Sequence, residues 1–132
     1  MTGYAIVLAS DDLARVQAVS IIGSIAAASD IPVEVFVTMD GLLPFETETV
    51  ESGDFNGGPV SLAMMEAEDV DIPLFTEQLT QAKEIGDLHV YACEMAMDLM
   101  GTTLEDYVDV FDDTLGVSGF LNRAADKQVI FV

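Results

Sequence analysis

Cysteine is almost absent from this sequence, in which Cys93 is the single thiol among 132 residues. An intramolecular disulfide is therefore excluded. Histidine is equally scarce, and the lone His89 lies four residues before Cys93. If both belong to one strand they are separated by about 13 Å, too far for a direct ion pair. A Cys–His hydrolase is therefore disfavoured, and we expect His89 to be a surface or interface residue.

Basic residues are also few: four Lys and Arg stand against 24 Asp and Glu, for a formal net charge of −20. Without a basic patch, nucleic acid and anionic membranes are disfavoured as partners. Such a surface repels itself at low ionic strength. In molar salt, where the Debye length is about 3 Å, the repulsion is largely screened. The composition thus suggests the cytosol of a halophile.

Long apolar runs are missing as well. The least polar stretch, residues 16–29, is interrupted by Gln17, Ser20 and Ser24 and is too short for a span that needs about 20 apolar residues. We expect a buried helix there instead. No cationic segment precedes the first apolar run, which disfavours a signal peptide and favours a cytoplasmic protein. Because hydrophobic residues make up 51% of the chain, we expect a folded single domain over residues 1–132.

What is present is an alternation of β-branched apolar runs with helical spacing. Strands are predicted over residues 4–9, 33–39 and 88–92, between 108 and 115, and over 128–132. Helices are predicted after Ser10 or Asp11 as N-cap, over 73–85 with Gly86 as C-terminal cap, near 104–107, and over 116–126. This order predicts an α/β fold, with a doubly wound, mostly parallel sheet of about five strands and helices on both faces.

Residues 42–72 interrupt the alternation. We expect an excursion or lid here, with a short helix over residues 60–66. Its glycine-rich part, residues 53–59, lacks the lysine and the strand-to-helix context of a Walker motif. Nucleotide binding is therefore not predicted.

In open parallel sheets, ligands bind outside the carboxyl ends of the strands. Five polar residues follow the first three predicted strands, and we take them as candidate substrate-binding residues beside Cys93: Ser10, Asp12, Thr38, Asp40 and Glu94. Asp40–Gly41 is equally explained as a turn. A surface ion pair of Arg15 is favoured over an anion site.

Cys93 is predicted to end a strand and begin a helix, whose free N–H groups favour a thiolate. Glu94 and Asp98 oppose that effect. The residue can act as nucleophile, persulfide carrier or soft-metal ligand, and a buried structural thiol is the alternative. Met95, Met97 and Met100 are thioethers suited to Cu(I), although Met in this setting more often packs in cores or interfaces.

Three landmarks resemble a known family: the strand ending at residues 10–12 before an alanine-rich helix, VEVFVTMDGL at 33–42, and ACEMAMDLMG at 92–101. They are similar to the DsrE/DsrF-like proteins, which include the TusD type of sulfur-relay subunit. The resemblance implies a doubly wound α/β domain that assembles as dimers, trimers or hexamers. It also implies sulfur carried as a persulfide on Cys93. Transfer between thiols requires no organic cofactor, and no metal site is predicted. Because the chain has one thiol, sulfur donor and acceptor proteins are the implied partners.

The leading hypothesis is a sulfur-relay protein that accepts and transfers sulfane sulfur through Cys93, whether as a sulfurtransferase or as a carrier. The first alternative is a non-catalytic oligomeric interaction module, in which Cys93 is structural and residues 42–72 form the binding surface. The second is a Cu(I) or redox-sensing protein that uses Cys93 and its neighbouring methionines.

Overall fold

One sheet of five parallel strands forms the centre of the chain, for which the computed structural model describes residues 2–69 and 71–132. Along the sheet the order is β4-β3-β2-β1-β5. The strands are β1 Tyr4–Leu8, β2 Val33–Val37, β3 Leu88–Cys93, β4 Asp113–Leu115 and β5 Gln128–Phe131. The all-parallel sheet confirms the predicted α/β fold.

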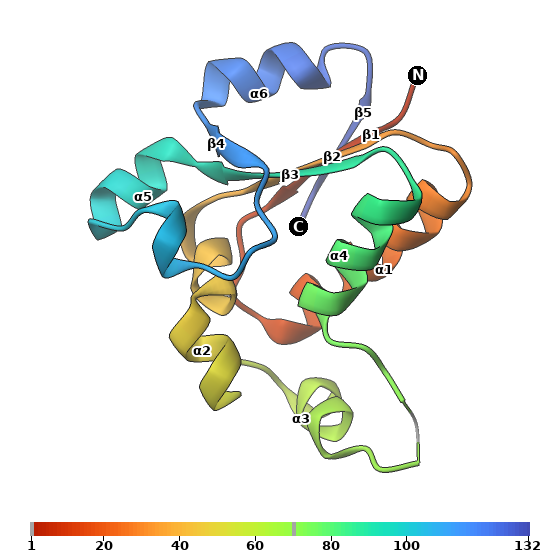
Figure 1. Cartoon of the computed structure of the whole chain (residues 1–132), viewed down its shortest axis with the longest axis vertical. Coiled ribbons are helices and arrows are strands. Elements are labelled where there is room, and N and C mark those ends of the chain that lie inside the picture. The colour runs from red at the N-terminus through yellow and green to blue at the C-terminus, as the bar shows by residue number, and fades with distance from the viewer. Residues whose placement is uncertain (1, 70) are drawn as a thin grey trace.

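Helices cover both faces of this sheet (Figure 1). On one face, α1 (Leu13–Ala28) packs against α4 (Phe75–Ile85). On the other face, α6 (Val117–Ala124) contacts β1 and β2. The shorter α5 (Glu94–Met100) follows β3 directly at the carboxyl end of the strand. The predicted doubly wound arrangement is therefore confirmed.

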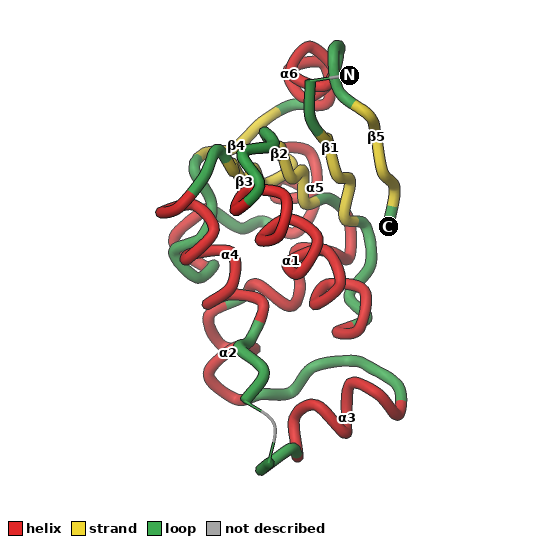
Figure 2. The backbone as a smooth tube through the Cα atoms, turned by 90° about the vertical axis from the view of Figure 1, so that its right-hand side faces the viewer, coloured by secondary structure: helices red, strands yellow, loops and turns green. Residues whose placement is uncertain are grey.

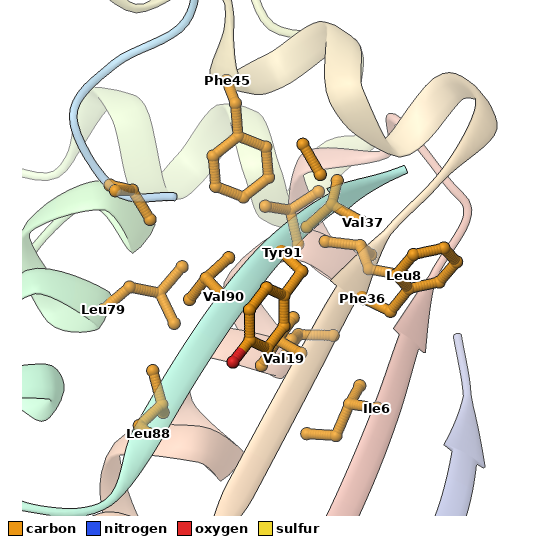
Figure 3. Close-up of a cluster of buried hydrophobic side chains, with 14 of the residues drawn as sticks. Ile6, Leu8, Val19, Phe36, Val37, Phe45, Leu79, Leu88, Val90 and Tyr91 are labelled. Atoms are coloured by element: carbon orange, nitrogen blue, oxygen red, sulfur yellow. The ribbon is translucent and has the colours of Figure 1, made fainter. Parts of the chain in front are cut away.

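The core lies on the two faces of the central strands. All five residues of β2 are buried, because both of its faces are covered by helices. Toward α4, Leu79 lies beside Leu88 and Val90 of β3 (Figure 3). Toward α6, the Phe36 ring stacks on Phe120 with a centroid separation of 4.6 Å.

The first helix differs from its prediction in two respects. The helix was predicted to be buried, but only one face of it is. On the other face, Ile21, Ile22 and Ile25 are at least 41% exposed. Its N-cap is Asp12, whose Oδ1 accepts from the Ala14 N–H at 3.0 Å. The predicted caps, Ser10 and Asp11, precede the residue that has the extended backbone required at this position.

Residues 42–72 contain more regular structure than predicted. Within this segment the structure describes every residue except residue 70. A 3₁₀ helix, η1 (Met39–Phe45), buries Leu42 and Phe45 in the core, so the excursion begins after them. The helix α2 (Thr47–Ser52) was not predicted, whereas α3 (Pro59–Glu66) confirms the short helix expected there. Figure 2 shows α2 and α3 standing away from the sheet.

The Asp40–Gly41 turn is also corrected, since both residues lie inside η1. The left-handed residue here is Met39, with φ 51°. Gly41 is needed for a different reason. A Cβ at this position would lie 2.4 Å from the Leu8 carbonyl oxygen, so only glycine lets η1 approach the end of β1 this closely.

The second half of the chain follows its predicted order with shifted ends. The helix predicted from Pro73 begins at Phe75, and its C-cap is Gly86, which is extended rather than left-handed. The short helix near 104–107 is the 3₁₀ helix η2 (Leu104–Asp106), which Thr103 and Asp106 close with a capping box. Within the described residues, no helix has the length and apolar character needed to span a membrane.

Candidate functional site

The first three strands end side by side at one edge of the sheet. β1 and β3 flank β2, and all three run parallel, so the residues that follow them share the carboxyl edge. Beyond the end of β2, the Thr38 N–H donates to the Leu8 carbonyl of β1 at 2.9 Å. This edge therefore holds the candidate residues taken from the sequence.

Cys93 is the last residue of β3 and the N-cap of α5. Its backbone is extended, with φ −65° and ψ 117°, which lets the chain pass from strand to helix without a linker. Its thiol is free and 0% exposed, and the side chain accepts no capping hydrogen bond from the helix. The predicted strand-to-helix junction is thus present, but the sulfur is enclosed.

A cavity of about 220 Å³ lies at the same edge, between η1 and α5. It is lined by Met39, Asp40, Leu42, Leu43, Ala96, Leu99 and Met100. Among the candidate residues, only Asp40 lines it. Ala96 and Leu99 were not predicted as site residues, although the spacing of residues 96, 99 and 100 on one helix face is a signal that could have identified them.

Ser10 and Asp12 are engaged in local structure. Ser10 Oγ accepts from the Asp12 N–H at 3.1 Å, while Asp12 caps α1. The neighbouring Asp11 accepts from Asn56 Nδ2 at 3.2 Å, which joins the excursion to the end of β1. The Leu13 N–H donates to the Asn56 carbonyl at 2.8 Å and strengthens that junction. Ser10 and Asp12 therefore stabilise the end of β1 and the start of α1, and they do not form a free binding surface.

The other candidates differ in exposure. Thr38 is buried, whereas Asp40 and Glu94 are exposed. Arg15 is exposed, and among the described residues no carboxylate oxygen lies within 4.0 Å of it, so the expected ion pair is not present. The structure brings Thr38, Asp40 and Cys93 to one edge, with Glu94 on the outer side of α5.

The methionines around Cys93 do not point to one shared site. Met97 is 4% exposed and packs in the core, whereas Met95 and Met100 are 46% and 57% exposed. This split fits core filling on one side of α5 and an apolar surface on the other. His89 is half-exposed, and its Nε2 lies 2.9 Å from Asp87 Oδ1, in keeping with the surface position expected for it.

A polar cluster on the α6 face was missed. Arg123 Nη1 donates to Glu34 Oε1 at 3.1 Å, and the guanidinium lies 4.7 Å from the centre of the Tyr91 ring. Burial raises the pKa of the Tyr91 hydroxyl, and the negative charge of Glu34 adds to the effect. The signal was Glu34 itself, the one charged residue within the apolar run of β2.

Together the fold and the edge define a class: small, doubly wound α/β proteins with a cysteine between the third strand and its helix. The chain belongs to the DsrE/DsrF/DrsH-like family, whose model matches residues 52–132 and thus includes β3 and Cys93. Membership indicates a sulfur-relay-type role, and proteins of this family are often oligomeric. The N-terminal landmarks at 10–12 and 33–42 lie outside the matched residues.

The fold is also similar to that of a solved structure. A protein of unknown function from Methanobacterium thermoautotrophicum, MTH1491, superposes with a TM-score of 0.65 over 100% of both chains, at 15% sequence identity. At that identity the likeness concerns the fold alone. No curated protein matches the chain.

Proposed function

We propose that this protein accepts sulfane sulfur on Cys93 and passes it to a thiol of a partner protein. The observation that carries the proposal is the position of the only thiol, at the carboxyl end of β3 within the segment that matches the family. In a parallel sheet this edge is where ligands are handled. Cys93 is also the only side chain of the chain able to form a persulfide.

The chemistry is two exchanges at sulfur. The Cys93 thiolate attacks the outer sulfur of a donor persulfide, R–S–SH, which gives Cys93–S–SH and releases the donor thiolate. An acceptor thiolate then attacks the outer sulfur of Cys93–S–SH, takes it as a new persulfide and restores the Cys93 thiolate. No net oxidation occurs and no organic cofactor or metal is required.

Because Cys93 is 0% exposed, a donor reaches it only after local opening. We propose that η1 and α5 supply this movement. Each has seven residues, and helices this short depend on packing rather than on their own stability. The cavity between them offers space into which side chains of the edge can shift.

Around this site, we propose that Thr38, Asp40 and Glu94 contact the donor or acceptor, while Ser10 and Asp12 maintain the edge. The exposed Asp40 and Glu94 give the approach a negative charge, which favours partners with basic contact surfaces. We further propose a cytoplasmic homo-oligomer, with residues 1–132 as one domain, adapted to high salt by its charge of −20.

The burial of Cys93 favours a second candidate, an oligomeric interaction module with a structural cysteine. Free cysteine is among the most buried residue types, so enclosure by itself is ordinary. This candidate predicts a thiol that stays unreactive in the folded protein, whereas sulfur relay predicts slow but complete reaction through opening.

The test is intact-mass spectrometry after incubation with inorganic polysulfide in about 2 M KCl. A gain of about 32 Da per sulfur atom that dithiothreitol removes, and that Cys93→Ser lacks, supports the proposal. A matched control, Cys93→Ser with Ala125→Cys, carries an exposed thiol at the end of α6 and shows that the reagent is active. If that control reacts while wild type neither gains sulfur nor reacts with iodoacetamide, Cys93 is structural.

A further inference from the structure

A second and larger cavity lies between α1 and the excursion. It has a volume of about 440 Å³ and is bounded by the first half of α1, by α3 and by Ile72. Small-molecule sites measure about 300–1,000 Å³ and are mostly apolar with a few polar groups. The two cavities have no lining residue in common, so this one is independent of the proposed sulfur chemistry.

The wall of this cavity is apolar and uncharged. Ala18 and Ile21 of α1 face Ala63 and Met64 of α3, and no Asp, Glu, Lys or Arg is among the lining residues. Its rim is open, since Ile21 is 41% and Val60 is 76% exposed. An uncharged apolar groove is unexpected on a chain with a net charge of −20. Exposed apolar patches of this kind mark sites that bind a ligand or a partner.

The only two polar residues of the lining are both more than nine-tenths buried, and both have an unpartnered oxygen. Gln17 is 5% exposed, and its Nε2 donates to the Pro73 carbonyl at 2.7 Å, which fixes the amide. Within the described residues, Gln17 Oε1 and Ser61 Oγ find no hydrogen-bond partner. Buried polar atoms are normally satisfied, and leaving one without a partner destabilises the fold.

We propose that this cavity binds a neutral aliphatic alcohol or a molecule that presents one. The aliphatic chain lies between α1 and α3, and the hydroxyl donates to Gln17 Oε1 and accepts from the Ser61 hydroxyl. A hydroxyl both donates and accepts, so one group can serve both orphaned oxygens. Each oxygen has less than 1 Å² of accessible surface in the free protein, so binding includes a small side-chain movement that uncovers them. A carboxylate is rejected, because it cannot donate to Gln17 and meets no cation in the lining.

The experiment is isothermal titration calorimetry of the full chain with 1-octanol and, separately, with sodium octanoate, in about 2 M KCl. We expect saturable 1:1 binding of octanol and at least about tenfold weaker binding of octanoate. Absence of saturable octanol binding up to its solubility limit overturns the proposal, as does equal affinity for octanoate.

Three variants locate the site. Ala18→Trp places an indole in the groove and is expected to abolish octanol binding, while Ala28→Trp, exposed at the other end of the same helix, leaves it unchanged. Ser61→Ala removes an unpartnered oxygen, so it leaves the melting temperature unchanged or higher and weakens octanol binding about three- to tenfold.

Two results with these variants overturn the proposal. Octanol binding that survives Ala18→Trp places the ligand elsewhere. A self-association in light scattering that Ala18→Trp removes, together with no octanol binding by wild type, makes a second copy of the chain the occupant of the groove.

Discussion

Arg123 of α6 donates from Nη1 to Oε1 of Glu34 on β2, at 3.1 Å. Glu34 is the inner partner, with 9% of its side chain exposed, and Arg123 the outer one, with 45% exposed. The bond holds α6 over the sheet at Glu34, where this carboxylate interrupts the apolar residues of β2. Glu34 Oε2 has no partner within the described residues, so the bond to Arg123 is the main compensation for this buried charge.

Removing the guanidinium should therefore destabilise the protein. We expect Arg123→Met, which keeps an aliphatic chain over Tyr91, to lower the free energy of unfolding by about 2 kcal/mol. Lys127→Met is the matched control. Its ion pair is with Asp126, which is 64% exposed, and its Nζ also donates to the Arg123 carbonyl at 3.1 Å. The loss of both should cost about 1 kcal/mol. Urea unfolding in molar salt measures both, and equal losses would contradict the assignment.

A substitution at Gly86 tests how closely α1 packs against the segment before β3. A Cβ at Gly86 would lie 2.4 Å from the Ala27 carbonyl oxygen, and its backbone is extended, so the obstacle is the contact and not φ. We expect Gly86→Ala to lower the free energy of unfolding by about 1–3 kcal/mol. Gly116→Ala, where a Cβ meets nothing within 4 Å, should change it by about 0.5 kcal/mol or less. A neutral Gly86→Ala would refute the close contact.

Alkaline pH should destabilise the fold through two tyrosines. Burial raises the pKa of both Tyr91 and Tyr107 above 10.0. A folded-state pKa above the unfolded value means that the contribution is fully present below about pH 10 and is lost as pH rises through the folded value. Urea unfolding between about pH 8 and 11.5 should show this loss, and Tyr91→Phe should reduce its slope. Parallel curves for wild type and Tyr91→Phe would rule out the Tyr91 contribution.

Salt should stabilise the protein because its acidic charge is largely uncompensated. Three of the four cations are already in ion pairs, those of Lys83, Arg123 and Lys127. We expect the melting temperature to rise between about 0.1 and 2 M KCl. Replacing the exposed Glu51, Glu66 and Glu105 by Gln should reduce that rise, because fewer charges repel. A melting temperature that does not depend on salt would exclude a halophilic adaptation by charge.

The three central strands could be predicted from the sequence because β1, β2 and β3 are apolar runs that pack in the core, whereas β4 and β5, at the edges of the sheet, have no buried residue. Val33–Val37 is apolar except for Glu34, and a run of this kind is typical of a central parallel strand. The helix ends were less predictable, since several residues suited to capping, Ser10 to Asp12, stand in a row before α1. Only the geometry at the end of β1 selects Asp12.

The site was predictable in its position but not in its accessibility. The strand-to-helix change at Cys93 can be recognised from residue types, and parallel strands bring the ends of β1, β2 and β3 together. Enclosure of the thiol depends on tertiary packing, because Cys93 belongs to a core cluster built from residues far apart in the chain. The unpartnered oxygens of Gln17 and Ser61 likewise follow from tertiary packing and carry no sequence signal.

The central claim, that Cys93 both accepts and passes on sulfur, is tested most directly by following one labelled atom. The protein is loaded with ³⁴S polysulfide, freed of excess reagent and mixed with a peptide that carries one thiol, and both masses are measured over time. The account predicts that the gain of about 34 Da on Cys93 declines while the same gain rises on the peptide, and that Cys93→Ser transfers nothing. Label that never appears on Cys93, or that stays there while the peptide thiol remains unmodified, would contradict it.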